Sequence, residues 1–172
     1  MDHEATAATN LKLPLQVVSP YDVNRLIREL EGIEDFVRQS TIRQPGVGVK
    51  LPHTSRLLED FAVINKLNFL QSADRSAAGS FLTEVNQKAP TIHISFAADP
   101  SAVFVGKIIL WLRTNIHPSL LLRIGLEPTI AAGCVVRTTN KQFDFSLRQH
   151  FNAKKGMLVG LIDGQMMKDI AK

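Results

Sequence analysis

Cysteine is nearly absent from the chain, which has Cys134 as its single cysteine among 172 residues. One cysteine excludes an intrachain disulfide and a cysteine-rich zinc site. Because Cys134 lies in an apolar, strand-like segment, we predict a buried and unreactive thiol. The five histidines, at positions 3, 53, 93, 117 and 150, lack the spacing of metal ligands. We therefore expect neither a metal site nor a bound cofactor.

Motifs for catalysis and phosphate binding are also missing. The sequence has no Gly-x-Ser-x-Gly elbow, and its glycine-rich run at 45–50 lacks the Gly-Lys-Ser/Thr of a phosphate loop, so we interpret this run as a linker. Asp144 and Ser146 are the polar pair that most invites a catalytic role. They stand just before a predicted helix, where such side chains cap free N–H groups. We expect a structural cap in a non-catalytic protein.

Long apolar runs are lacking as well. None approaches the roughly 20 residues that cross a bilayer, and the start Met1-Asp2-His3-Glu4 lacks the basic-then-apolar order of a signal peptide. We expect a cytosolic protein. The net charge is +4, and residues 91–172 carry 10 basic and 5 acidic groups against 10 and 11 in residues 1–90. This excess favours an acidic partner, protein or nucleic acid, although a merely solvated surface explains it equally well.

Helical periodicity dominates the first half of the chain. We predict a mobile tail over 1–18 and a helical domain over 19–89. Ser19 and Pro20 begin the first helix, Thr54 caps the second, and Ser72 or Asp74 begins a third that ends near Lys88. The first helix carries an apolar stripe. The stripe comprises Val23, Leu26, Ile27, Leu30, Ile33 and Val37. It faces the core, or part of it receives a partner helix, for which Val23, Ile27 and Leu30 are the candidates.

Residues 90–153 predict a domain in which strands and helices follow one another. Ile92–Phe96 is a strand, and Asp99-Pro100 begins a helix with Phe104, Ile108, Trp111 and Leu112 along one side, where Trp111 is expected to face inward. Leu120–Gly125 and Ile130–Arg137 are predicted to pair as an antiparallel hairpin around Glu127-Pro128. A turn at 138–141 leads to a short strand at Phe143–Phe145, and Ser146 with Gln149 forms a capping box. The fold class is α+β, an N-terminal all-helical unit followed by a small mixed β-sheet covered by helices.

Residues 154–172 form a C-terminal tail or a helix extension. Glycines at 156, 160 and 164 disfavour a helix, and we predict a break near Lys155. Their spacing of four has a second interpretation. In a helix, Gly156 and Gly160 would make a strip on which a partner helix packs closely.

Two segments together resemble a known family. The run Pro128–Arg137 (PTIAAGCVVR), followed by Asp144–Arg148 (DFSLR), resembles the C-terminal signature of the delta subunit of F-type ATP synthases, which includes the oligomycin-sensitivity-conferring protein. The matching residues are Gly133, Arg137, Asp144, Ser146, Leu147 and Arg148. Ala132 and Phe145 stand where the family usually has glycine. The resemblance covers about Thr91–Phe151.

The resemblance implies a non-catalytic stator subunit that links the catalytic head to the peripheral stalk. It implies two partners, the N-terminal helices of the alpha subunits and the C-terminal helix of the b subunit, no small-molecule substrate, and a peripheral location on the cytoplasmic face of the cell membrane. Candidate partner-binding residues are Val23, Ile27, Leu30, Arg123, Gly156 and Gly160. The alternatives are a small basic nucleic-acid-binding domain and a free-standing adaptor. The lack of an aromatic ladder and a predicted inward Trp111 disfavour nucleic acid.

Overall fold

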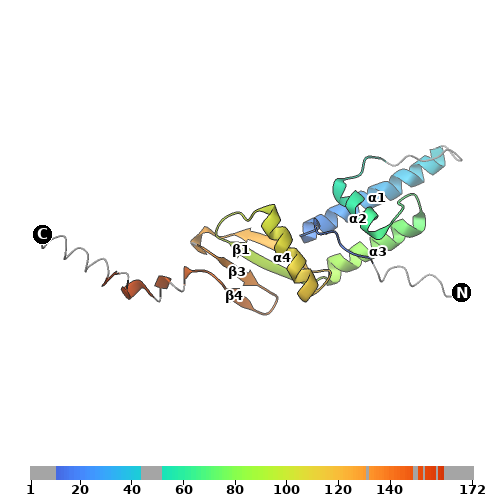
Figure 1. Ribbon diagram of the computed structural model, residues 1–172. Coiled ribbons are helices and arrows are strands. Elements are labelled where there is room, and N and C mark those ends of the chain that lie inside the picture. Colours follow the sequence, from blue (N-terminus) through green and yellow to red (C-terminus); the bar gives the residue numbers. More distant parts are fainter. Residues whose placement is uncertain are drawn as a thin grey trace. The chain divides into compact units, whose positions relative to one another are not determined.

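The computed structural model describes residues 11–43, 52–130 and 132–148, with 151–152, 154–157 and 159–160. Its fold is α+β, with helices followed by a mixed sheet, as predicted (Figure 1). The chain divides into two compact units. The first runs to Ile92 and resumes over Ser101–Arg123, and the second comprises His93–Pro100 and the chain from Ile124 onward. The division therefore differs from the predicted boundary between residues 89 and 90. The predicted linker at 45–50 and the capping residue Gln149 lie outside the described residues.

The first helix, α1, spans Pro20–Arg43 and begins where the sequence predicts. The N–H of Ser19 donates to the Asp22 carboxylate at 2.8 Å, and the N–H of Asp22 donates to the Ser19 hydroxyl at 3.3 Å. These reciprocal bonds satisfy backbone donors at the helix start. The apolar stripe faces the core, with Leu26 and Ile33 buried among its members.

Helix α2 spans Arg56–Asn65 and helix α3 spans Ser72–Lys88. The N-cap of α2 is Ser55, whose hydroxyl accepts from the N–H of Leu58 at 3.3 Å, so the predicted cap at Thr54 is wrong by one residue. Thr54 instead bonds Glu59 through its hydroxyl. Serine and threonine both cap helices well, so the sequence did not distinguish these two neighbouring positions.

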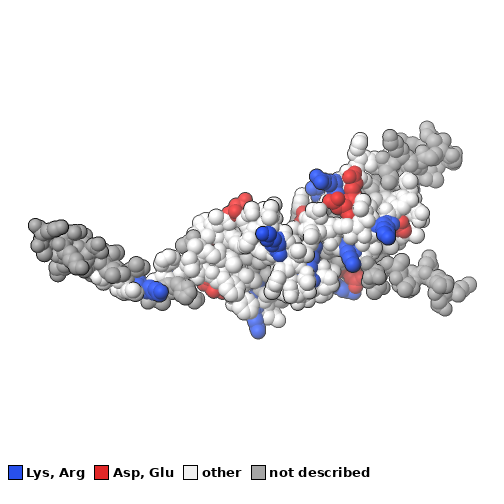
Figure 2. Space-filling model, viewed as in Figure 1, with Lys and Arg blue, Asp and Glu red and all other residues white. Residues whose placement is uncertain are grey.

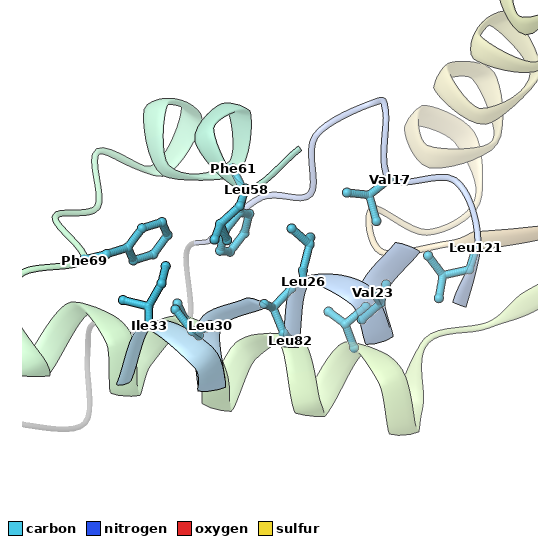
Figure 3. Packing of buried hydrophobic residues seen from close by; sticks show 12 residues of the cluster. Val17, Val23, Leu26, Leu30, Ile33, Leu58, Phe61, Phe69, Leu82 and Leu121 are labelled. Atoms are coloured by element: carbon cyan, nitrogen blue, oxygen red, sulfur yellow. The ribbon is translucent and has the colours of Figure 1, made fainter. Parts of the chain in front are cut away.

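The core of the first unit is formed by apolar side chains from α1, α2 and α3, which converge in Figure 3. Phe61 of α2 is fully buried and stacks on Phe81 of α3 with ring centroids 6.1 Å apart. Val17 belongs to the same core, and Pro14 is also fully buried. The prediction of a mobile tail is therefore wrong for residues 11–18. Apolar side chains of this segment are buried, and its backbone carbonyls accept hydrogen bonds.

The sheet has strand order β2-β1-β3-β4. The strands are β1 (Thr91–Phe96), β2 (Leu121–Leu126), β3 (Cys134–Arg137) and β4 (Gln142–Asp144). Strands β1 and β3 are antiparallel, as are β3 and β4. The N–H of Leu121 donates to the carbonyl of Pro90, and that of Glu127 donates to the carbonyl of Phe96. The residue numbers on both strands increase from the first bond to the second, so β1 and β2 run in the same direction. A parallel pair of this kind is what a crossover connection requires.

The predicted hairpin between the segments now called β2 and β3 is wrong, because β1 lies between them. The chain reverses direction between β2 and β3, but the two strands lie on opposite sides of β1 and do not pair with each other. The N–H of Glu127 bonds to Phe96, and Pro128–Ile130 then forms a short 3₁₀ turn, η2. The predicted turn at 138–141 is confirmed. The N–H of Thr138 donates to the carbonyl of Lys141 at 2.8 Å, which joins β3 to β4 as a hairpin.

Helix α4 spans Ala102–Asn115, and its N-cap is Ser101 rather than Asp99-Pro100. Its buried residues are Val105, Ile109 and Leu112. The prediction that Trp111 faces inward is wrong, since its side chain is 60% exposed, and Phe104 is 48% exposed. The helix is apolar on almost every side, so the spacing of its apolar residues fits more than one inner face.

The described residues between 151 and 160 are helical, including Lys154–Met157, which corrects the predicted break near Lys155. Their side chains are exposed, and among them Phe151 is 57% and Met157 66% exposed. No helix within the described ranges combines the length and apolar content needed to span a bilayer.

Candidate partner-binding surfaces

Gly133 adopts a backbone conformation that requires glycine. Its φ is +96°, a region that residues with a Cβ atom rarely adopt. A Cβ atom there would lie 2.3 Å from the carbonyl oxygen of Phe145 and 3.0 Å from the Cα of Ser146. The glycine therefore lets the backbone before β3 approach the backbone after β4, which brings two parts of the signature together.

Asp144 ties the turn that follows β4. One oxygen of its carboxylate accepts a hydrogen bond from the N–H of Ser146 at 2.8 Å. The Ser146 hydroxyl and N–H together hold the pKa of the Asp144 carboxyl below its usual range, and Arg148 adds a smaller effect in the same direction. Ser146 is buried. The bond to Asp144 ties the turn after β4, and the capping box predicted for Ser146 involves Gln149, which lies outside the described residues.

The remaining signature residues lie around the same strands. The N–H of Leu147 donates to the carbonyl of Ala132 at 3.0 Å, which extends the pairing beyond β4. Arg137, at the end of β3, donates from Nε to the side chain of Gln142 at 3.2 Å and lies 3.8 Å from the carboxylate of Glu127. Leu147 and Arg148 are exposed. The signature thus forms a framework whose outer side chains remain accessible.

A cavity of about 410 Å³ lies between α1 and α3 in the first unit. It is lined by Ile27, Leu30, Glu31 and Glu34 from α1 and by Ser72, Arg75, Ser76, Gly79 and Thr83 from α3. Val23 is fully buried, so a partner cannot contact it in this structure. Leu30 is buried at the cavity wall, and Ile27 is half-buried. Of the three candidates on α1, Ile27 offers the most accessible apolar surface.

Arg75 fixes one wall of this cavity. Its side chain is buried and donates to the carbonyls of Phe69 at 2.9 Å and Leu70 at 3.0 Å. It also donates to the carboxylate of Glu34, and this bond lowers the pKa of Glu34. Glu31 is exposed beside Glu34. The α1 side of the cavity therefore has acidic side chains above an apolar floor. Such a surface suits a helix with apolar and basic residues.

A second hollow of about 530 Å³ lies between α1 and the segment before α2. It is lined by Glu29, Gly32, Ile33, Phe36, Leu58 and the segment 52–55. Phe36 is 38% exposed here, and it was not among the residues predicted to bind a partner. Its position three residues after Ile33 is the signal that places it at the edge of the same stripe.

The other candidate residues do not belong to these hollows. Arg123 is exposed on β2. Gly156 and Gly160 are exposed in helical segments, and a Cβ atom on either would meet no atom of the described chain within 4 Å. Their small size is therefore not required by contacts with the described chain. Among the described residues, no group of His, Cys, Asp and Glu side chains is arranged to hold a metal ion.

No protein-family model matches the chain, and no curated protein is significantly similar to it.

Proposed function

We propose that this chain is a non-catalytic stator subunit of the delta type, which links the catalytic head of an F-type ATP synthase to its peripheral stalk. The proposal is supported by the close approach of Gly133 to the backbone of Phe145 and Ser146, because it brings together the two segments that resemble the delta signature. The bond from Ser146 to Asp144 supports it further. In this role the signature supplies stiffness, and it takes no part in a reaction.

A stator must hold the head still against the torque of the turning central stalk. The cavity between α1 and α3 supports such a grip, because Ile27 gives apolar contact and Glu31 gives charge along one groove. An N-terminal helix of the alpha subunit is the proposed occupant, bound with its apolar side toward Ile27. The b subunit is the proposed partner of the second unit. This assignment places the protein at the cytoplasmic face of the cell membrane, attached through its partners.

Binding of the full-length chain to the purified ATP synthase head of the same organism tests the proposal. We expect a stable complex in size-exclusion chromatography, and at least tenfold weaker binding for Ile27→Glu. The matched control is Val63→Glu, which makes the same change at a side chain that is 76% exposed on α2. Circular dichroism should show both variants folded. Failure of the unmodified chain to bind the head would contradict the proposal.

One observation favours the nucleic-acid alternative. Phe143 and Phe145 stack with ring centroids 6.3 Å apart and are 45% and 62% exposed. Exposed aromatic rings near basic residues bind the bases of single strands, and Lys141 and Arg148 flank this pair in the sequence. Retention on a single-stranded oligonucleotide at physiological salt, with a steep salt dependence, would support this function. The stator proposal predicts no such retention.

A further inference from the structure

Strand β4 lies at the edge of the sheet, with β3 on its inner side (Figure 1). In an antiparallel pair, alternate residues of a strand turn their backbone groups toward the partner strand. The N–H of Phe145 donates to the carbonyl of Cys134 at 2.9 Å, so the odd-numbered residues here direct their backbone groups toward β3. The N–H and carbonyl groups of Gln142 and Asp144 therefore point away from β3, to a side on which the structure describes no further strand.

This edge carries an exposed aromatic pair. Side chains alternate along a strand, so Lys141, Phe143 and Phe145 lie on one face of the sheet, and Gln142 and Asp144 lie on the other. Phe143 and Phe145 stack on each other while both remain exposed. Edge strands often avoid pairing with another chain by carrying several charges or a proline. In β4 the one charged residue is Asp144, no residue is proline, and Figure 2 shows a largely uncharged surface around the strand.

The sequence of this edge is complementary to itself when two copies run antiparallel. Pairing centred on Phe143 uses the whole of β4, because Phe143 then faces its own copy and Gln142 faces Asp144. Just outside the strand, Lys141 faces the exposed ring of Phe145. A register moved by two residues in one direction would set two Asp144 carboxylates face to face. The same move in the other direction would separate the two Phe143 rings.

The polar side chains on the other face match in the same register. The amide oxygen of Gln142 accepts from Nε of Arg137 at 3.2 Å, which leaves the amide NH₂ group as the donor. The Asp144 carboxylate accepts from the N–H of Ser146 at 2.8 Å, and a carboxylate accepts more than one such bond. Gln142 of one copy can therefore donate to Asp144 of the other. A guanidinium, an amide and a carboxylate then follow one another across the junction.

We propose that the chain associates with a second copy of itself through β4, as a twofold dimer in which the two edge strands pair antiparallel and join the two sheets. The occupant is a second copy because the strand itself supplies a matching residue for each of its own positions. Since β4 has three residues, we expect a reversible dimer that depends on protein concentration. The contact goes beyond the stator role and uses none of the residues that line the cavity between α1 and α3.

Sedimentation equilibrium of the full chain at rising concentration tests for the dimer. We expect a monomer–dimer equilibrium, and association weaker by roughly tenfold or more for Phe143→Glu, because two carboxylates would then face each other at the twofold axis. The matched control is Val63→Glu, which makes an acidic change at an exposed side chain of α2 and should dimerise as the unmodified chain does. Circular dichroism checks that both variants are folded.

Disulfide trapping tests the register independently. Cys134→Ser first removes the native thiol. In that background, Phe143→Cys should form a disulfide with its own copy on mild oxidation, because directly opposed residues of a non-hydrogen-bonded pair have Cα atoms about 4.5 Å apart. Gln142→Cys is the matched control. It lies opposite Asp144, so its two copies are offset along the strands by two positions and are too far apart for a disulfide.

Two results would overturn the inference. In the first, the chain stays monomeric at every concentration, and retention on a single-stranded oligonucleotide that Phe143→Glu abolishes would then assign the aromatic pair to nucleic acid. In the second, a dimer forms, but Phe143→Glu leaves it unchanged and Phe143→Cys gives no cross-link, which assigns the dimer to another surface. Neither result bears on binding to the ATP synthase head, which Ile27→Glu tests separately.

Discussion

The carbonyl oxygen of Phe145 lies 2.3 Å from the point that a Cβ atom on Gly133 would occupy. Since the φ of Gly133 is also +96°, any other residue there meets both a backbone clash and a strained conformation. Closure of the chain around β3 and β4 therefore depends on this glycine.

Gly133→Ala should lower the free energy of unfolding by about 2 kcal/mol or more, because the alanine must displace the backbone at Phe145. Urea unfolding followed by circular dichroism measures the change. Gly156→Ala is the matched control. It adds a Cβ atom in open space within a helical segment and should be neutral or stabilising by up to about 1 kcal/mol. Equal midpoints for Gly133→Ala and the unmodified chain would show that the close approach is not required.

Arg113 holds the segment before α1 against the start of β2. It donates to the carbonyls of Pro14 at 2.8 Å and Leu120 at 3.1 Å, and also to that of Val17. Burial lowers the pKa of Arg113 to about 10, so the group is still protonated at neutral pH.

Arg113→Ala should destabilise the protein by roughly 2 to 4 kcal/mol, because these carbonyls lose a charged donor. Arg113→Lys keeps the charge but has no planar fork of donors, and it should recover less than half of the loss. Denaturant unfolding of the two variants gives the comparison. Full recovery by lysine would mean that charge, rather than the geometry of the guanidinium, holds the segment.

Glu34 should make the stability of the helical unit depend on pH. Its bond with Arg75 holds the pKa of Glu34 below the ordinary value of 4.5 in the folded state. A carboxyl with a lowered folded-state pKa stabilises the protein above its unfolded-state pKa, and this stabilisation is lost as the pH falls through the folded-state value.

The difference in unfolding free energy between the unmodified chain and Glu34→Gln should therefore stay constant from about pH 7 to pH 5 and shrink below about pH 4.5. Urea unfolding at a series of pH values measures it. A difference that is unchanged, or that grows, on further acidification would contradict the assigned role of Arg75.

The sequence predicts the local elements of this fold well because their signals lie within a few residues. Ser19 caps α1 as expected, α3 ends before Pro90, and the turn at 138–141 joins β3 to β4. Long-range pairing is different. The segments that became β2 and β3 are neighbours in the sequence and looked like a hairpin, but their partner is β1, some thirty or more residues earlier in the chain. No pattern within a few residues of these segments shows which strand they pair with.

The buried and exposed sides of the helices were predicted correctly only where the local sequence pattern distinguishes them. The stripe on α1 has a polar back, so its buried side was clear, and Val23 accordingly lies in the core. Helix α4 has almost no polar back, so the spacing of its apolar residues did not show which side is buried. Trp111 was therefore predicted to face inward, whereas the structure exposes it.

The most direct test of the stator role is affinity purification of the tagged full-length chain from detergent-solubilised membranes of its own organism, followed by quantitative mass spectrometry. We predict enrichment of the alpha and b subunits of the ATP synthase over an untagged control. Recovery of neither subunit, with nucleic acid or unrelated proteins in their place, would contradict it.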